Sequence, residues 1–238
     1  MPEVPALSIL GVKIQGEIAP GDSVAERILD ACRQMALRLE DGDVVVVTHK
    51  IVSKSEGRVV RLDRDDVEAR ERLIEAESAR ILRRRGNLVI AQTRHGFVCA
   101  NAGVDSSNVE PGWVSLLPLD PDKSARRIRS QLHRLGGVDV AVIITDTFGR
   151  AWRIGQVNVA IGVAGMLPTR NYREALDSFG QVLLVTNIAI ADEVAGAAEL
   201  VMGKSDGVPV AIVKGAMVPR GRGNARQLLR SPQEDLFL

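Results

Sequence analysis

Residues 141–156, AVIITDTFGRAWRIGQ, form the stretch of sequence that most constrains the fold. The apolar, β-branched run from Ala141 to Ile144 predicts a strand buried in a core. This run halts at Thr145-Asp146-Thr147, and arginines follow at Arg150 and Arg153. A core strand thus delivers a carboxylate and two hydroxyls to its end. The residues alone leave two interpretations open, an ordinary polar turn or a functional site.

The overall composition describes an ordinary globular chain. Its 238 residues are 45% hydrophobic and 26% charged, which argues against global disorder. The formal net charge of +1 gives no bulk field for nucleic acid. Only 3% of the residues are aromatic, which speaks against a platform for stacking bases. We therefore expect no nucleic-acid partner.

The cysteines and the apolar runs indicate a cellular compartment. Cys32 and Cys99 are the only cysteines, and they have no metal-binding spacing. We expect both to be reduced core residues. No apolar run approaches the length of a membrane span, and the N-terminus lacks the features of a signal peptide. These features predict a cytoplasmic, disulfide-free protein without a membrane partner.

Apolar periodicity and turn signals predict the remaining elements. Ser23 and Glu26 have the spacing of a capping box, which starts a helix reaching about Leu39. The charged residues 64–85 predict a solvated amphipathic helix. Further extended segments are expected at 44–47, 51–54, 88–92, 97–100, 138–144 and 208–213, and further apolar runs lie at 157–163 and 182–190. Helices are expected at 123–135 and 193–202. The tail, residues 217–238, is expected to form a loop with a short amphipathic turn.

The order of these elements predicts the fold class. Strands and helices alternate without a strict βαβ rhythm. The sequence contains neither a GxGxxG after a strand nor a GxxxxGK[ST], so neither a Rossmann nor a P-loop site is indicated. An α+β fold with mixed sheets and flanking helices fits best.

Polar side chains gather at three places along the chain: Thr48-His49-Lys50 with Lys54, residues 105–108, and Thr145-Asp146-Thr147. Asp105 and Asp146 offer the oxygen ligands that Mg²⁺ and Mn²⁺ prefer. Lysine and arginine side chains nearby suit phosphate oxygens. Because 41 positions separate the two aspartates, a joint metal–phosphate site remains one hypothesis beside that of unrelated turns.

Several longer segments match a known family in order along nearly the entire chain. They are DGDVVVVTHKIVSKSEGRVV at 41–60, TRHGFVCANAGVDSSNV at 93–109, GVDVAVIITDTFGRAWRIGQ at 137–156, ELVMGKSDGVPVAIVKG at 199–215 and the closing ARQLLRSPQEDLFL. Together they resemble the coenzyme F420-0:L-glutamate ligases, also called F420 γ-glutamyl ligases. The two-domain actinobacterial form continues into a flavin-binding nitroreductase-like domain, which we do not expect here.

The resemblance implies an enzyme and an architecture. GTP, L-glutamate and F420-0 would give F420-1, GDP and phosphate through an acyl phosphate, and further γ-linked glutamates can follow. Mg²⁺ or Mn²⁺, as two divalent ions, and K⁺ are the implied cofactors. One ligase domain over residues 1–238, divisible into two α+β subdomains, would form an intertwined homodimer.

The resemblance also implies roles for individual residues. Asp105 and Asp146 are similar to ligands of a divalent metal, with Thr147 contributing at a second ion. We assign catalytic roles to Asp146, Lys54 and Arg153. His49 stands where the family usually has a serine that contacts GTP. The residues implied to bind GTP are Gln15, Gly16, Glu17, Ile18, His49, Lys54, Asn108, Gly203, Lys204, Ser205 and Asp206.

Some residues depart from the family pattern. Ile154 and Asn158 replace Asn and Asp in a WRNGQTD motif, so we expect no polar role for them. Lys204 replaces an acidic metal ligand, so either the second metal is held differently or the lysine meets phosphate. Residues 171–180 diverge and can tune the acceptor pocket. Two alternatives therefore stay open: a ligase of this fold with another carboxylic-acid acceptor, and a non-catalytic nucleotide- or F420-binding subunit.

Overall fold

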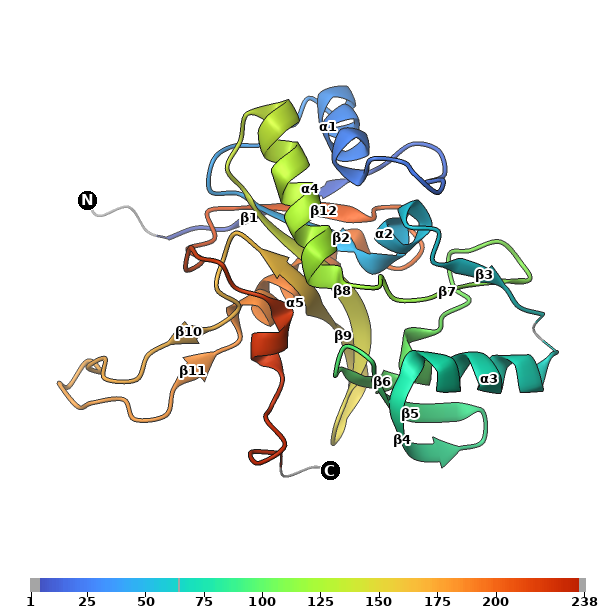
Figure 1. Ribbon diagram of the computed structural model, residues 1–238. Coiled ribbons are helices and arrows are strands. Elements are labelled where there is room, and N and C mark those ends of the chain that lie inside the picture. Colours follow the sequence, from blue (N-terminus) through green and yellow to red (C-terminus); the bar gives the residue numbers. More distant parts are fainter. Residues whose placement is uncertain (1–4, 64, 236–238) are drawn as a thin grey trace.

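A five-stranded mixed sheet lies at the centre of the computed structural model, which describes residues 5–63 and 65–235 (Figure 1). β2 and β8 run parallel, and every other neighbouring pair in this sheet is antiparallel. The prediction of an α+β fold with mixed sheets is confirmed. In spatial order the strands are β1 (Ser8–Val12), β12 (Val210–Lys214), β2 (Val44–Thr48), β8 (Ala141–Arg150) and β9 (Arg153–Ala164).

Helices flank this sheet. α1 (Val24–Gln34) packs on α4 (Pro121–Gly136), and α4 lies against β8 and β9 in front of the sheet in Figure 1. α5 (Ile190–Met202) contacts β9, β1 and β12. The short α2 (His49–Ser55) follows β2 directly. The expected extended arm at 51–54 is therefore wrong, and His49 begins a helix.

The start of α1 was predicted correctly and its end was not. The Ser23 hydroxyl accepts a hydrogen bond from the Glu26 backbone N–H at 3.3 Å, as the capping spacing predicts. The helix ends at Gln34 instead of near Leu39. Ala36 adopts a left-handed φ of 51°, and the Leu37 N–H donates to the Cys32 carbonyl at 2.9 Å. This is a Schellman end, and alanine at the position that usually holds glycine gave no stop signal.

A second, smaller apolar cluster lies beside the main core. Ile74, Val89 and Leu116 are among its buried side chains. The cluster is built from α3 (Val67–Glu77), the pair β3 (Val59–Arg61) and β7 (Trp113–Ser115), the 3₁₀ turn η1 (Asn101–Gly103), and a three-stranded sheet of β4 (Ser78–Arg85), β5 (Leu88–Thr93) and β6 (Val98–Ala100).

The helix predicted over residues 64–85 is therefore wrong in its second half; residue 64 lies outside the described residues. Ser78 ends α3 in extended backbone, and its hydroxyl donates to the Ile74 carbonyl at 2.6 Å. The arginine-rich segment that follows pairs antiparallel with β5. Gly86, with a φ of 55°, lies in the turn that joins the two strands. Tertiary pairing here overrides the helical charge pattern.

β8 does not end at Thr145, contrary to the sequence prediction. Its parallel pairing with β2 ends at Thr48 opposite Thr145, but β8 continues to Arg150 as a hairpin with β9. A register shift between Ile144 and Thr145 marks the transition. Asp146 and Thr147 thus follow the last residue of β8 that pairs with β2. From there on β8 is paired only with β9, which leaves space for a cavity beside these polar side chains.

Residues 172–186 carry apolar side chains outward. They connect the short strands β10 (Arg170–Asn171) and β11 (Asn187–Ile188), and they extend away from the sheet in Figure 1. The apolar run at 182–190 is consequently not a core strand. The exposed apolar side chains of this segment are Leu176, Phe179, Val182, Leu184 and Val185. The 3₁₀ turn η2 (Ala225–Leu228) lies in the tail.

The state of the two cysteines and the lengths of the apolar runs were also predicted from the sequence. Cys32 and Cys99 are buried and free, as predicted. Within residues 5–63 and 65–235, no helix combines the length and apolar character that crossing a bilayer requires.

Replacing Gly162 by alanine tests how closely α4 seats on β9. A Cβ at this position would lie 2.4 Å from the Pro121 carbonyl oxygen, so the helix must shift. We expect Gly162→Ala to lower the free energy of unfolding in urea by about 1–3 kcal/mol. The control, Gly196→Ala in α5, meets nothing closer than 3.9 Å and should add up to about 1 kcal/mol. Equal stability of the two variants would contradict this packing.

Candidate active site

A cavity of about 1140 Å³ lies where the two apolar clusters meet. Ile18 and Ile51 from the larger cluster and Val104 from the smaller one line it. This volume lies above the usual range of about 300–1,000 Å³ for a pocket that holds one drug-sized ligand. Its described walls come from the segments 14–20, 48–59, 100–113, 145–158 and 199–209.

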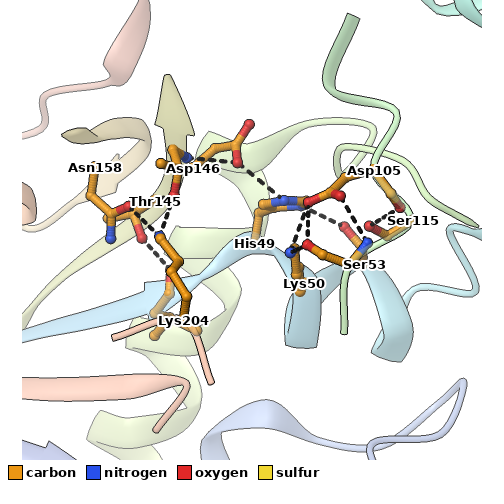
Figure 2. A network of polar contacts seen from close by, with 12 residues as sticks. His49, Lys50, Ser53, Asp105, Ser115, Thr145, Asp146, Asn158 and Lys204 are labelled. Carbon is orange, nitrogen blue, oxygen red and sulfur yellow. Dashed lines mark hydrogen bonds and ion pairs between the residues drawn. The ribbon is translucent and has the colours of Figure 1, made fainter. Parts of the chain in front are cut away.

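Asp105 and Asp146 both line this cavity although they are distant in sequence. Asp146 lies on β8, just past the last residue that pairs with β2. Its Oδ1 accepts a hydrogen bond from the Thr147 N–H at 2.7 Å. Figure 2 shows His49 between the two aspartates. The sequence hypothesis that the two carboxylates belong to one site is thus consistent with the geometry.

His49 lies beneath Asp146 and is buried, with 1% of its surface exposed. Its Nδ1 is 3.3 Å from Ser53 Oγ, and its Nε2 is 3.3 Å from Asp146 Oδ1. The second approach falls outside hydrogen-bond geometry, and Nε2 has no hydrogen-bond partner among the described residues. The buried imidazole thus lies close to the Asp146 carboxylate without a hydrogen bond to it, and it is not among the described residues that line the cavity.

Asp105 is held by one ammonium group and one serine. Lys50 Nζ lies 2.8 Å from Asp105 Oδ2. The Ser107 N–H and hydroxyl donate to the two carboxylate oxygens at 2.8 and 2.7 Å. Burial raises the pKa of Asp105, but Lys50 and Ser107 together outweigh it and hold the pKa below its ordinary value. Asp105 is therefore a carboxylate near neutral pH.

On the opposite wall, Lys204, Thr147, Asn158 and Glu199 form a closed polar ring. Lys204 Nζ contacts Glu199 Oε1 at 2.7 Å and Thr147 Oγ1 at 2.5 Å. The Thr147 hydroxyl donates to Asn158 Oδ1 at 2.7 Å, and Asn158 Nδ2 donates to Glu199 Oε2 at 2.7 Å. Asn158 is buried. It thus has a polar role, contrary to expectation.

Most residues predicted to bind nucleotide surround the same cavity. Lys54 Nζ lies 2.6 Å from Glu17 Oε2, which joins two of the predicted segments. Asn108 Nδ2 donates to the Lys204 carbonyl at 3.4 Å, which joins two others. Binding of nucleotide by this set stays a prediction. Those that line the cavity are Gly16, Glu17, Ile18, Lys54, Asn108, Gly203 and Lys204.

Other predicted site residues lie away from the cavity walls. Gln15, Ser205 and Asp206 are next to lining residues but are not among those described as lining the cavity. Arg153 is exposed and pairs with Arg150 near the tip of the β8–β9 hairpin. Within one chain, Arg153 is therefore not brought to the two aspartates, and its catalytic role remains a prediction.

Three features of the site were not singled out from the sequence. The sequence placed Lys50 only in a polar strand end and did not indicate that it pairs with Asp105. Glu199 lies in a predicted alanine-rich helix, where nothing marked it as a partner of Lys204. Cys99 lies near Asp146. Burial and the negative charge of Asp146 raise the pKa of the Cys99 thiol to about 12. A thiol that stays protonated is a poor nucleophile, so thiolate chemistry is not indicated here.

The donor chemistry of the cavity suits hard divalent cations. Asp105 and Asp146 provide carboxylate oxygens, the ligand type that Mg²⁺ and Mn²⁺ prefer. Among residues 5–63 and 65–235, no group of three or more His, Cys, Asp or Glu side chains gathers as a complete ligand set. An ion held here would therefore take part of its coordination from substrate phosphates, as Mg²⁺ commonly does.

Comparison with known proteins places the chain in a family. The sequence profile of the F420-0:Gamma-glutamyl ligase family matches residues 11–215, and the chain belongs to this family. It is 42% identical to the coenzyme F420:L-glutamate ligase of Methanopyrus kandleri over 98% of both chains. It is 41% identical to that of Methanothermobacter thermautotrophicus over 97% of this chain and 98% of the relative. The Methanocaldococcus jannaschii ligase is 42% identical over 84% of this chain and 86% of its own.

The ion pair at Asp105 can be tested by changing its partner. In Lys50→Met the burial of Asp105 remains while the ammonium is lost, so the carboxyl pKa should rise. Carboxyl-carbon NMR titration measures it. In the wild type the pKa lies below the unfolded value of about 3.9, so the ion pair stabilises the fold above that pH. This contribution is lost as the pH falls through the folded pKa.

The control for this titration is Lys50→Arg, which keeps the positive charge. Its Asp105 carboxyl should retain a pKa below the ordinary range. If Asp105 titrates identically in Lys50→Met and in the wild type, the ion pair does not set the pKa.

Proposed function

We propose that this chain is a GTP-dependent ligase that joins L-glutamate to coenzyme F420-0 and releases GDP and phosphate. The observation that carries the proposal is the near full-length identity with relatives named coenzyme F420:L-glutamate ligase. A large cavity lined by carboxylates and lysines that form ion pairs supports it. Addition of further γ-linked glutamates belongs to the same proposal.

The proposed chemistry explains why the site needs charge more than a nucleophile. A carboxylate is a poor electrophile, so the F420-0 carboxylate takes the GTP γ-phosphoryl group and becomes an acyl phosphate. The glutamate amine then attacks the acyl carbon and phosphate leaves. Phosphoryl transfer depends on alignment and on neutralising charge. No side chain of the protein has to form a covalent intermediate.

Each group of residues has a part in this scheme. Mg²⁺ or Mn²⁺ held by Asp105 and Asp146 would supply charge neutralisation to the phosphates, and K⁺ is a further proposed ion. Lys54 and the 14–18 segment hold the nucleotide from one wall. Asn108 and the 203–204 segment hold it from the other. His49 positions Asp146, and Arg153 could serve only if another element brings it near the phosphates.

The divergence of residues 171–180 from the family pattern motivates a second candidate, a ligase of this fold with a different acceptor acid. The divergent segment 171–180 is largely exposed, and it lies outside the described walls of the cavity. An acceptor acid that extends out of the cavity to this segment would meet different contacts there, while the phosphoryl chemistry inside the cavity stays the same. Release of GDP with other carboxylic acids, but not with F420-0, would identify this case.

We also propose that the protein is a homodimer. Ile154 and Trp152, at the tip of the β8–β9 hairpin, are 99% and 79% exposed, and Phe179 and Leu184 are similarly exposed. Exposed apolar side chains on projecting segments, here two separate ones, are typical of surfaces that a partner covers. A second copy packed on these hairpins would also give Arg153 a neighbour outside its own chain.

The activity is tested by product mass. Purified protein is incubated with F420-0, L-glutamate, GTP and Mg²⁺ or Mn²⁺, and mass spectrometry should show the addition of glutamate. Asp146→Asn keeps the side-chain shape but removes the charge that faces the phosphates. We expect its rate to fall at least about 100-fold. Asp30→Asn, on the exposed face of α1, is the matched control and should keep the wild-type rate. No glutamate addition with any metal would contradict the proposal.

The dimer is tested by molar mass in solution. Ile154→Asp places a charge on the apolar hairpin tip, where burial against a partner would be costly. We expect light scattering to show the dimer mass for the wild type and half of it for Ile154→Asp. Val67→Asp changes an exposed apolar residue at the start of α3 and should leave the mass unchanged. A monomeric wild type would refute the assignment.

A further inference from the structure

The Lys204 ammonium lies inside a set of oxygen ligands. Its Nζ is 2.5 Å from Thr147 Oγ1, 2.7 Å from Glu199 Oε1 and 3.3 Å from Asn158 Oδ1. These oxygens come from β8, α5 and β9, and Figure 2 shows Lys204 reaching toward Asn158. A hydroxyl, a carboxylate and an amide carbonyl are the ligand types that hard cations take.

Hydrogen bonds between the ligands orient this oxygen set. The Thr147 hydroxyl gives its proton to Asn158, so its lone pairs are free to face the ammonium. The Asn158 amide nitrogen is occupied by Glu199, which turns its oxygen toward Lys204. Asn158 is only 4% exposed, so packing holds it in this orientation. The three ligands are therefore arranged around a positive charge by contacts that do not involve Lys204 itself.

The position is also part of the cavity. Thr147, Asn158, Glu199 and Lys204 all line it, as does Asp146, the neighbour of Thr147. The loop that carries Lys204 leaves α5 at Gly203, whose φ of 59° turns the chain. Asn108 donates to the Lys204 carbonyl from another wall. Lys204 is thus held in the cavity wall both through its ammonium group and through its backbone carbonyl.

We propose that the Lys204 ammonium is a built-in cation that replaces the divalent ion predicted at Thr147, so that the chain binds one divalent ion with its nucleotide instead of two. The inference rests on the proposed function, because it concerns the charge that faces the GTP phosphates. An ammonium and a divalent ion cannot share Thr147 Oγ1, since like charges would then be in contact. The carboxylate of Asp146 stays available to one ion.

Counting bound Mn²⁺ tests the inference without measuring turnover. Protein with saturating GDP is titrated with Mn²⁺, and free Mn²⁺ is followed by electron paramagnetic resonance. We expect one tightly bound ion per chain in the wild type. Lys204→Ala exposes the oriented oxygens and should bind a second ion. Lys204→Ser is the substitute if the alanine variant fails to fold.

Two controls separate charge from shape. Lys204→Arg keeps a positive charge at the oxygen set and should still bind one ion. Adding Glu199→Gln to Lys204→Ala removes the carboxylate from the vacated position and should weaken the second ion at least tenfold.

The outcomes distinguish the inference from the proposed function. Two Mn²⁺ ions in the wild type, or one in both Lys204→Ala and Lys204→Ser, overturns the inference and leaves the ligase proposal standing. Failure of the wild type to bind GDP with Mn²⁺ overturns the nucleotide site itself, and the inference with it.

Discussion

The parallel pairing of β2 with β8 is the constraint on which the whole site depends. Both strands are buried runs of β-branched residues, and they stay paired until Thr48 lies opposite Thr145. Because the two strands point the same way, the residues that follow each of them emerge at one edge of the sheet. His49 thereby comes beside Asp146, and Lys50 lines the same cavity. The hydrophobic core thus determines where the polar chemistry is placed.

Charge in the cavity is arranged in pairs instead of a single acidic cluster. Lys50 meets Asp105, Lys54 meets Glu17, and Lys204 meets Glu199. An ammonium held by a carboxylate stays in place, and a phosphate can compete for it when a nucleotide enters. A cavity lined by carboxylates alone would repel a polyanion in the absence of metal. Paired lysines lessen that repulsion before any ion binds.

Sequence reasoning succeeded where a local signal coincided with the tertiary structure. The Ser23 cap and the buried run before Thr145 were both readable, since each is decided by neighbouring residues. It failed where the usual local signal is absent or where distant contacts decide the outcome. Ala36 ends α1 without a glycine, and the arginines after Ser78 form a strand because β5 lies beside them. The position of β5 was not available from the charge pattern.

The departures from the family pattern are also not independent of one another. Read along the sequence, Asn158 and Lys204 are two separate losses of acidic character. In the fold, the Asn158 carbonyl is a ligand of the Lys204 ammonium, and Glu199 closes the ring. An aspartate at 158 beside Glu199 would put two like charges in contact, whereas the amide donates to Glu199 and accepts from the cation. Ile154 differs in kind, because it is 99% exposed and belongs to the surface of the hairpin. The substitutions at Asn158 and Lys204 are therefore coupled by direct contact in the fold, whereas Ile154 is independent of them. The spacing of residues in a single sequence does not reveal this contact.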